Sequence, residues 1–298
     1  MVTSKVVLIT GTSSGFGRDA ALALARRGHH VVATMRDSAG KNAGVAAELH
    51  RAAESENLPL RVLDLDVTDA ATITSAVADV MAREGRIDVL VNNAGTMPLG
   101  VTEAFSAEQL SALLDTNVVG AFRMVQAVLP HMRGAGSGRL VHLSSIAGRF
   151  AFPFAGIYHA SKFGLEGLME GLGYEVSAFG IESVIVEAGP FKTNLFSAGA
   201  KPERHDVLAS YGATAERCVQ FLGGFEHMFA APEMADAVDP KHVVDVLVDV
   251  VERAPGTCPQ RVPVGLTFGL AELNTAIHGF ERGALEAMRV GDLAARTA

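Results

Sequence analysis

Tyr158 and Lys162 stand four positions apart, a spacing that places a phenol and an amine on one face of a helix, about one turn from each other. A tyrosine hydroxyl with its ordinary pKa of about 10 is a poor base at neutral pH. A neighbouring ammonium group favours the phenolate and lowers that pKa, which makes the tyrosine a usable proton donor and acceptor. The pair therefore predicts general acid–base chemistry, although the same spacing also occurs in ordinary pairs on a helix surface.

Two further polar residues are candidates for the same chemistry. Ser145 ends the strand-like segment RLVHLSS, thirteen residues before Tyr158, and its hydroxyl can bind a substrate oxygen and stabilise charge developing there. The alternative for Ser145 is a hydroxyl that only bonds the following loop. Ser144 points to the other strand face, and we expect a structural role for it. Asn117 interrupts a helical pattern, where an amide is unfavourable unless it has a local partner; it is either functional or a buried packing residue.

The segment VVLITGTSSGFGR, residues Val6 to Arg18, admits two interpretations. The pentapeptide that starts at Gly11 fits the G-x-S-x-G elbow of a serine nucleophile, whereas the spacing of Gly11, Gly15 and Gly17 is typical of a loop around a dinucleotide phosphate. An elbow needs an upstream loop to complete its oxyanion hole, and only ten residues precede Gly11. A phosphate loop needs only a strand before it and a helix after it, whose free N–H groups face the pyrophosphate. We therefore predict a phosphate-binding loop.

Short apolar runs separated by helical patterns must position these residues. Several runs are continuous rather than alternating, as in strands covered on both faces. Strand and helix in alternation predict parallel pairing with right-handed crossovers. We predict a single α/β domain over residues 1–298, a doubly wound (Rossmann) three-layer αβα fold with about seven parallel strands. The predicted strands are Val6–Ile9, Val31–Met35, Leu60–Val67, Val89–Val91, Leu140–Leu143, Ile181–Val186 and Val262–Val264. Helical patterns cover 17–28, ending at Gly28 as a C-cap, 70–85, and 106–132, where Ser106 and Gln109 form a capping box.

Residues 191–239 break this alternation, because they contain no clear strand. An insertion of that length inside a compact domain is usually functional, and we expect a helical substrate lid. Apolar walls suit a hydrophobic carbonyl compound or secondary alcohol, although many of these side chains can simply pack the lid onto the body. The candidate wall residues are Phe191, Leu195, Phe196, Tyr211, Phe221, Leu222, Phe225, Met228 and Phe229, with Met97, Leu99, Phe152 and Phe154 outside the insertion.

Composition excludes other classes of function. The net charge of −8 argues against a nucleic-acid partner, which clustered Lys and Arg usually bind. Cys218 and Cys258 are far apart and lack metal-ligand spacing, so we expect reduced thiols and no metal. The adjacent His29 and His30 would face opposite ways in a strand, which is poor geometry for one metal ion. No apolar run approaches a membrane span and no signal-peptide core is evident, so we expect a cytoplasmic protein.

Several motifs together resemble the short-chain dehydrogenase/reductase family, in its order and at its intervals, over residues 1 to about 195. The compact glycine spacing resembles the oxidoreductase branch, and the long insertion looks most like the hydroxysteroid and retinol dehydrogenases within it. The motifs are TGTSSGFG (10–17), NNAG (92–95), Asn117, Ser145, YHASK (158–162) and AGPFKT (188–193).

The resemblance implies roles for these positions. Asn117 is expected to bend its helix and hold a water in a proton relay with Lys162, while Asp66 contacts adenine and Thr193 holds the nicotinamide carboxamide. This chain departs from the family pattern at Ala188-Gly189, where Pro-Gly is usual, so the turn before Thr193 is set differently. The expected cofactor-binding residues are Gly11, Ser13, Ser14, Gly15, Phe16, Gly17, Arg36, Asp66, Val67, Asn93, Ala94, Gly95, Tyr158, Lys162, Pro190 and Thr193.

The end of the second strand indicates which cofactor is used. NAD enzymes usually place an acid there for the ribose 2′-hydroxyl. Here Met35 is followed by Arg36, whose guanidinium can pair with a 2′-phosphate, although Asp37 would favour NAD if the register were shifted. We expect NADP(H) to be preferred, with NAD(H) possible.

These observations predict an NADP(H)-dependent oxidoreductase that interconverts a hydrophobic ketone or aldehyde with its alcohol, with Asn117, Ser145, Tyr158 and Lys162 as its catalytic residues. Two alternatives remain open: a cofactor-binding sensor or scaffold without turnover, and a lyase or isomerase that uses the cofactor transiently. The resemblance also implies a homodimer or homotetramer paired through the helices that carry Asn117 and Tyr158.

Overall fold

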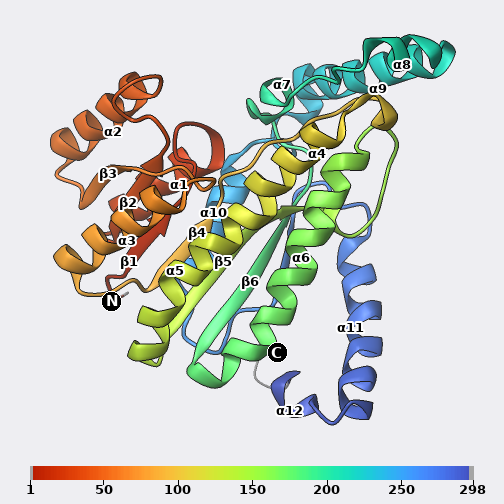
Figure 1. Cartoon of the computed structure of the whole chain (residues 1–298). Coiled ribbons are helices and arrows are strands. Elements are labelled where there is room, and N and C mark those ends of the chain that lie inside the picture. The colour runs from red at the N-terminus through yellow and green to blue at the C-terminus, as the bar shows by residue number, and fades with distance from the viewer. Residues whose placement is uncertain (1–2, 295–298) are drawn as a thin grey trace.

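The computed structural model describes residues 3–294, and its centre is one seven-stranded parallel sheet (Figure 1). The strand order is β3-β2-β1-β4-β5-β6-β7, so the direction of strand addition reverses between β1 and β4. In open sheets of this kind, ligands bind at the carboxyl ends of the strands beside that reversal. The strands are β1 (Val6–Ile9), β2 (His30–Met35), β3 (Leu60–Asp64), β4 (Val89–Asn92), β5 (Gly138–Ser145), β6 (Ile181–Ala188) and β7 (Arg261–Val264).

Helices cover both faces of the sheet, which explains why its strands are continuously apolar. In β1, Val7 and Ile9 pack into one core cluster, and Val6 and Leu8 pack into the other. The first cluster is completed by α1 (Gly15–Arg26), α2 (Ala43–Glu56) and α10 (Lys241–Glu252), and the second by α3 (Ala70–Glu84), α5 (Gly120–Ala135) and α6 (Gly156–Val176). The doubly wound three-layer prediction is confirmed.

All seven predicted strands are present, with small differences at their ends. The third strand ends at Asp64, three residues before the predicted Val67, and the chain turns there toward α3. Gly28 follows α1 with a φ of +84°, as expected for a residue just past a helix end. The capping box of Ser106 and Gln109 is also present.

The long helical pattern at 106–132 contains an irregularity that carries Asn117. It consists of α4 (Ala107–Leu114), one π-helical turn (Asp115–Val119) and α5. By length and composition alone, the continuous stretch 107–135 is the one helix among the described residues that could cross a membrane. Met124 and Val128 of this helix are fully buried in the core cluster that includes Leu90 and Leu140 of the sheet, so packing accounts for its apolar face.

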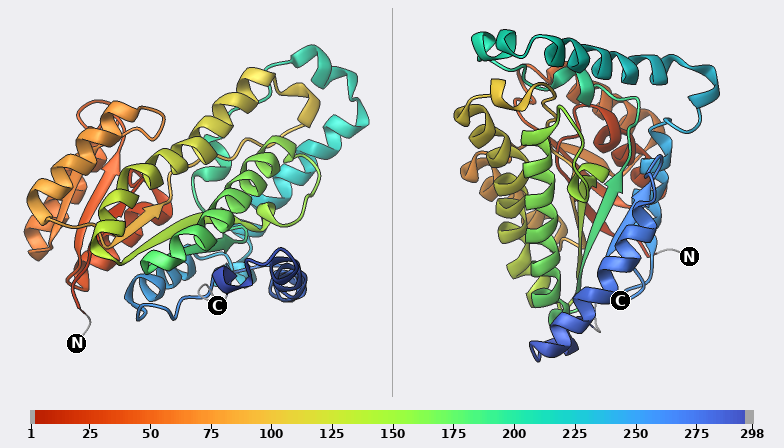
Figure 2. Two further views of the ribbon diagram at one scale, coloured as in Figure 1. Left: turned by 60° about the horizontal axis from the view of Figure 1, so that its bottom comes forward. Right: turned by 90° about the vertical axis from the view of Figure 1, so that its right-hand side faces the viewer.

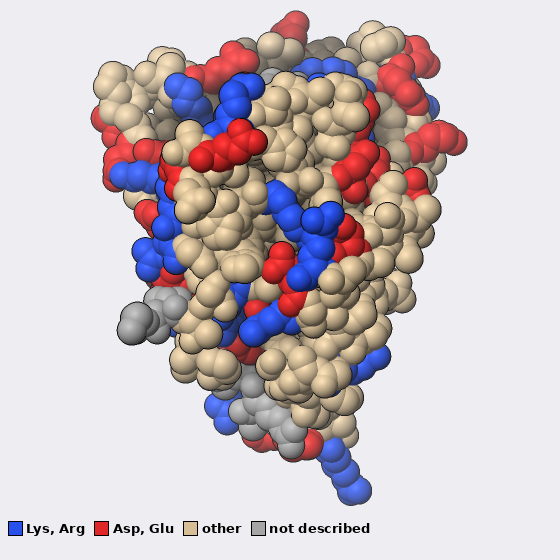
Figure 3. All heavy atoms as spheres, turned by 90° about the vertical axis from the view of Figure 1, so that its left-hand side faces the viewer, with Lys and Arg blue, Asp and Glu red and all other residues tan. Residues whose placement is uncertain are grey.

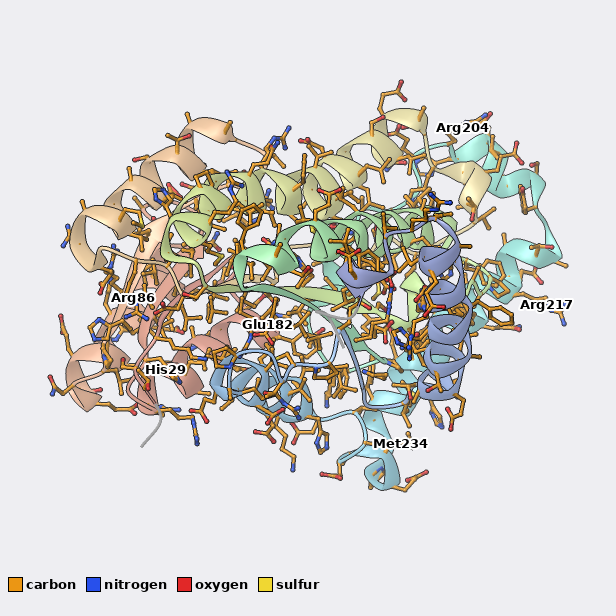
Figure 4. The ribbon with its side chains drawn as sticks, turned by 90° about the horizontal axis from the view of Figure 1, so that it is seen from below. His29, Arg86, Glu182, Arg204, Arg217 and Met234 are labelled. Carbon is orange, nitrogen blue, oxygen red and sulfur yellow. The ribbon has the colours of Figure 1, made fainter. Side chains whose placement is uncertain are left out.

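The insertion 191–239 forms helices that lie across the carboxyl end of the sheet (Figures 1 and 2). These are α7 (Leu195–Ala198), α8 (His205–Ser210), α9 (Ala213–Ala230) and a 3₁₀ turn (Pro232–Met234). In Figure 4 the labelled Arg204, Arg217 and Met234 mark this region, and His29 and Arg86 lie toward the opposite end of the molecule. Two further helices, α11 (Leu270–Ala287) and α12 (Gly291–Ala294), are not indicated by any sequence motif; α11 runs along the side of the molecule (Figure 2, right).

Charges of both signs are interspersed on the face of the molecule seen in Figure 3. Many charged side chains of the described chain are paired with each other: Arg26 binds Glu56 and Arg27 binds Glu252 near the amino end of the sheet. His29 is buried beside Glu252 and His30 is exposed beside Glu84, so the two rings face different partners as predicted.

Candidate active site

A cavity of about 650 Å³ opens at the carboxyl ends of the strands and extends from the glycine loop to the helical insertion. Its size is typical of a site for a small organic ligand or cofactor. Sixteen of the eighteen predicted site residues line it: Gly11, Ser13, Ser14, Gly15, Phe16, Arg36, Asp66, Val67, Asn93, Ala94, Gly95, Ser145, Tyr158, Lys162, Pro190 and Thr193. Gly17 and Asn117 lie behind the wall.

The glycine loop is packed so closely against the loop after β4 that side chains are excluded. Gly11 has a φ of +70°, and a Cβ added to it would lie 2.7 Å from Ala94 Cα. A Cβ on Gly17 would lie 2.3 Å from Asn93 Nδ2, which itself donates to the Gly11 carbonyl at 2.9 Å. This packing presents the amino end of α1 to the cavity, an arrangement suited to phosphate groups. Gly17 therefore lies behind the loop, and its contact with a ligand stays a prediction.

Tyr158 and Ser145 meet in the cavity wall. Tyr158 is 3% exposed and its hydroxyl is hydrogen-bonded to Ser145. Ser145 Oγ also accepts from the Ala147 N–H at 3.2 Å, so the bond to the following loop is present. The binding of a substrate oxygen by this hydroxyl stays a prediction. Burial raises the pKa of Tyr158, the bond to Ser145 opposes that effect, and the charge of Glu166 adds to it.

The pKa of Tyr158 is shifted in the direction opposite to the one predicted from the sequence. The spacing predicts a lowered value, whereas the structure raises it because burial of the phenol dominates. The ammonium of Lys162 lies 5.9 Å from the centroid of the Tyr158 ring, and its Nζ donates to the Leu143 carbonyl at 2.7 Å. Burial lowers the pKa of Lys162 to about 8, against the opposing influence of Glu166.

Asn117 lies in the layer behind these groups. Its Oδ1 accepts from the Thr96 N–H at 2.9 Å, and its Nδ2 donates to the Thr96 carbonyl at 2.9 Å and to Ser161 Oγ at 3.0 Å. The bend expected at Asn117 is present as the π-helical turn. The structure does not place Asn117 in direct hydrogen-bonding contact with Lys162 among the described residues; it joins the loop after β4 to α6 instead.

Arg36 and Asp37, at the end of β2, differ in the contacts that their side chains make. Arg36 is exposed at the cavity wall, and the structure shows no side-chain partner for it among residues 3–294. Asp37 has a φ of +51° and its carboxylate accepts from the Lys41 N–H at 2.7 Å, so it closes its own turn. Asp66 keeps its place in the wall while its Oδ1 accepts from the Thr68 N–H at 2.9 Å. The cation, not the acid, is available at the end of β2.

The unusual Ala188-Gly189-Pro190 turn packs against the chain that follows β7. The Gly189 N–H donates to the Val264 carbonyl at 2.9 Å, and a Cβ on Gly189 would lie 2.5 Å from the Leu266 carbonyl oxygen. Thr193 still reaches the cavity wall, where its Oγ1 accepts from the Leu195 N–H at 3.4 Å. The change in sequence at this turn therefore does not remove Thr193 from the site.

The end of the cavity under the insertion is apolar. Phe221 and Phe225 of α9 stack edge to face with ring centroids 5.1 Å apart, and Phe196 of α7 lies 4.9 Å from Phe225. Among the candidate wall residues, four do not line the cavity: Tyr211, Leu222, Phe229 and Phe154. Tyr211, Leu222 and Phe154 pack the insertion onto the body, and Phe229 contacts Phe196 and Phe225 within the insertion. Sequence reasoning missed Thr96, Phe150 and Phe268, although Phe268 follows soon after the predicted strand Val262–Val264 and its place at a strand's carboxyl end was a usable signal.

The described part of the chain contains no cluster of three His, Cys, Asp or Glu side chains able to hold a metal ion. Cys218 and Cys258 are both buried free thiols, in agreement with the prediction.

Comparison with known proteins gives the class and then the family. A sequence profile described as short chain dehydrogenase matches residues 5–204. Human 17-beta-hydroxysteroid dehydrogenase type 1 is 38% identical over 255 residues, which is 84% of this chain and 74% of the relative. The 3-ketodihydrosphingosine reductase of Bacteroides thetaiotaomicron is 39% identical over 190 residues, 63% of this chain and just under two thirds (65%) of the relative.

Among solved structures, a short-chain dehydrogenase from Streptomyces avermitilis superposes with a TM-score of 0.74 at 33% identity, covering 96% of this chain and 98% of that one. A metagenomic short-chain oxidoreductase solved in complex with NADP shares the fold, with a TM-score of 0.65 at 23% identity over 88% of this chain and 97% of that chain. The protein is an oxidoreductase that acts on hydroxyl or carbonyl groups with a nicotinamide dinucleotide. It belongs to the short-chain dehydrogenase family.

Proposed function

We propose that this protein is an NADP(H)-dependent oxidoreductase that interconverts a hydrophobic ketone or aldehyde with its alcohol. The observation that carries the proposal is the Tyr158 hydroxyl, bonded to Ser145, in the wall of a cavity that has a phosphate-binding loop at one end and an apolar surface at the other. The glycine loop suits the cofactor because Gly11, where a Cβ would collide with Ala94, lets the loop pack closely and present the amino end of α1 to the cavity.

The residues of the site divide the chemistry among them. Tyr158 gives a proton to the substrate oxygen in reduction and takes it back in oxidation, while Ser145 orients that oxygen. Lys162 stabilises the phenolate and binds the cofactor ribose. Asn117 holds the main chain at Thr96 against α6 through Ser161. Asn117 also takes part in the proton relay through water that the resemblance implies. The chemistry that the nicotinamide supplies when bound is hydride transfer to or from the substrate carbon.

The preference for NADP(H) is supported by Arg36. Its guanidinium stands exposed at the cavity wall, whereas the acid that would select NAD(H), Asp37, is committed to the Lys41 main chain. A guanidinium binds a 2′-phosphate through charge-assisted hydrogen bonds that the 2′-hydroxyl of NAD(H) does not offer.

The apolar end supports a hydrophobic substrate. Phe196, Phe221 and Phe225 form aromatic contacts there, and the residues 191–239 that carry them act as a lid over the substrate. The names of the two relatives described above refer to a sphingoid ketone and a hydroxysteroid, both largely hydrophobic molecules. We further propose a cytoplasmic homodimer or homotetramer; Val119 and Phe163, exposed on the helices that the resemblance places at the interface, support that pairing.

The test is oxidation of NADPH by the purified chain against a panel of ketones and aldehydes: a keto steroid, a long-chain 3-keto amine, retinal and a small polar ketone. We expect turnover with at least one hydrophobic member and weaker turnover with the polar ketone. If NADPH binds but no member is reduced, the sensor or scaffold alternative replaces the proposal. If product forms without net loss of NADPH, the protein is a lyase or isomerase.

A further inference from the structure

Consecutive residues at the end of β5 each hold one residue of α6. Two of these contacts belong to the site described above: the Leu143 carbonyl with Lys162 Nζ, and Ser145 with the Tyr158 hydroxyl. The third lies between them on the strand, where Ser144 Oγ donates to Glu166 Oε1 at 2.5 Å. The partners on α6 are spaced by four residues, so Glu166 stands one turn beyond Lys162 as Lys162 stands one turn beyond Tyr158.

Glu166 is a buried carboxylate that the main chain at Gly148 approaches closely. It is 2% exposed, and a Cβ on Gly148 would lie 2.1 Å from its Oε1, so the main chain after β5 is closely applied to the carboxylate. Its Oε2 lies 2.6 Å from Nη1 of Arg261, which comes from β7. A carboxylate buried to this degree destabilises the fold unless it is paired and hydrogen-bonded, and both conditions are met here.

We propose that Glu166 is a positioning residue of the reaction: held by Ser144 and Arg261, it fixes α6 on the end of β5 and supplies the negative charge that accompanies Lys162. This proposal rests on the proposed function, because it assigns Glu166 to act through Lys162 and Tyr158.

The electrostatics of the site agree with the geometry. Burial lowers the pKa of Lys162 to about 8, and the charge of Glu166 is the influence that raises it. The same charge raises the pKa of Tyr158. Loss of the negative charge therefore makes both groups release their protons at lower pH.

Other charged groups face Glu166 from neighbouring elements. Glu187 of β6 also binds Arg261, at 2.7 Å, and Arg149 from the segment after β5 lies 3.9 Å from Glu187. Asn274 of α11 donates to Glu187 at 2.6 Å and accepts from Arg149 at 2.9 Å, which ties the C-terminal helix to this cluster.

Glu170 provides a matched control. It lies one turn beyond Glu166 on α6 and pairs with Arg261 Nη2 at 2.7 Å, but among the described residues it forms no hydrogen bond with β5. Tyr174 of α6 and Glu281 of α11 are the remaining titratable groups on that side, and both are influenced by Glu170. The Glu170→Gln variant therefore removes the same charge from the same arginine without touching the strand.

The first experiment measures the titration of the Lys162 amine in the cofactor-free protein by NMR of ¹³C-labelled lysine, assigned with a Lys162→Met variant. We expect its pKa to fall by at least roughly half a pH unit in Glu166→Gln and to stay close to the wild-type value in Glu170→Gln. An unchanged titration in Glu166→Gln, or an equal change in Glu170→Gln, overturns the electrostatic part of the proposal. This readout needs no turnover, so it stays informative even if the proposed activity is wrong.

The second experiment separates position from charge. Ser144→Ala removes the bond to Glu166 and leaves the carboxylate in place, and we expect kcat to fall roughly tenfold while the Kd for NADPH stays within about twofold. Ser183→Ala is the matched control, because Ser183 is another buried strand serine that holds α6, through the Met169 carbonyl at 3.0 Å, and we expect it to keep wild-type kcat. Unchanged kcat in Ser144→Ala, or an equal loss in Ser183→Ala, overturns the proposal, and this comparison decides the matter if Glu166→Gln does not fold.

Discussion

Lys162 Nζ lies 5.9 Å from the centroid of the Tyr158 ring, one turn further along α6, and its donation to the Leu143 carbonyl holds it there. Burial acts on the two groups in opposite directions, raising the pKa of the phenol and lowering that of the amine. In the protein without cofactor, Tyr158 is therefore protonated at neutral pH. That state suits proton donation to a carbonyl oxygen, which is the requirement of the reductive direction.

Replacement of Tyr158 by Phe removes the hydroxyl and leaves the ring packed against its neighbours. We expect the Tyr158→Phe variant to bind NADPH with nearly wild-type affinity and to lose at least about 100-fold in turnover, the low end for a positioned acid–base group. Stopped-flow or steady-state NADPH oxidation, with binding followed by nucleotide fluorescence, measures both quantities. Turnover close to that of the wild type would mean that another group transfers the proton.

Arg36 is expected to set the preference between the two nicotinamide cofactors. Because its guanidinium is free to form charge-assisted bonds with a 2′-phosphate, Arg36→Ala should lower kcat/KM for NADPH by roughly tenfold or more and leave kcat/KM for NADH nearly unchanged. The ratio of the two values is the measurement. Arg51, exposed on α2 away from the cavity, gives the control variant Arg51→Ala, which should keep the wild-type ratio. A wild-type enzyme that prefers NADH contradicts the assignment at once.

Phe225 tests the apolar end of the cavity. It lines the wall and packs between Phe196 and Phe221, so Phe225→Ala should raise the KM for a bulky hydrophobic ketone by roughly fivefold or more, from the loss of buried apolar surface, with little change in NADPH affinity. Phe229 belongs to the same aromatic row on α9 but does not line the cavity. Equal effects of Phe225→Ala and Phe229→Ala would show that the row only holds α9 in place.

The fold and the wall of the site were predictable from local patterns. Continuous apolar runs predicted all seven strands because each strand is buried on both faces, and a polar residue at the end of such a run, as with Ser145, marked the functional edge of the sheet. Asn117 and Gly17 were predicted as site residues, but pattern alone could not tell that they stand behind the wall, since that depends on how the loop after β4 packs.

Properties that depend on tertiary structure escaped sequence reasoning. The direction of the Tyr158 pKa follows from its burial and from the orientation of the Lys162 amine, neither of which a spacing of four residues encodes. The buried pair of Glu166 and Arg261 joins residues 95 positions apart, and it exists only because β7 lies beside β6. No sequence pattern indicates that a glutamate on a helix and an arginine at the start of a distant strand form an ion pair.

His142 should make the stability of the protein sensitive to acid. It is fully buried in β5, where its Nδ1 lies 3.2 Å from Asn92 Nδ2, and burial lowers its pKa to about 3. The unfolded chain binds a proton at His142 below about pH 6.5, whereas the folded chain does so only near pH 3. The stability that a neutral His142 contributes is therefore fully present above about pH 6.5 and is lost as the pH falls from about 6.5 toward 3.

The measurement is the difference in Tm between about pH 7.5 and about pH 5 for the wild type and His142→Gln, whose amide can still accept from Asn92. We expect the variant to be less stable at the higher pH but to lose less Tm on acidification. The raised pKa of Glu187 acts with the opposite sign, because a carboxyl group that is more easily protonated in the folded state favours folding at lower pH, but it is common to both proteins and cancels. His131→Gln, on the exposed side of α5, controls for the exchange itself. An equal acid-induced loss of Tm in wild type and His142→Gln would show that His142 does not remain neutral in the folded chain.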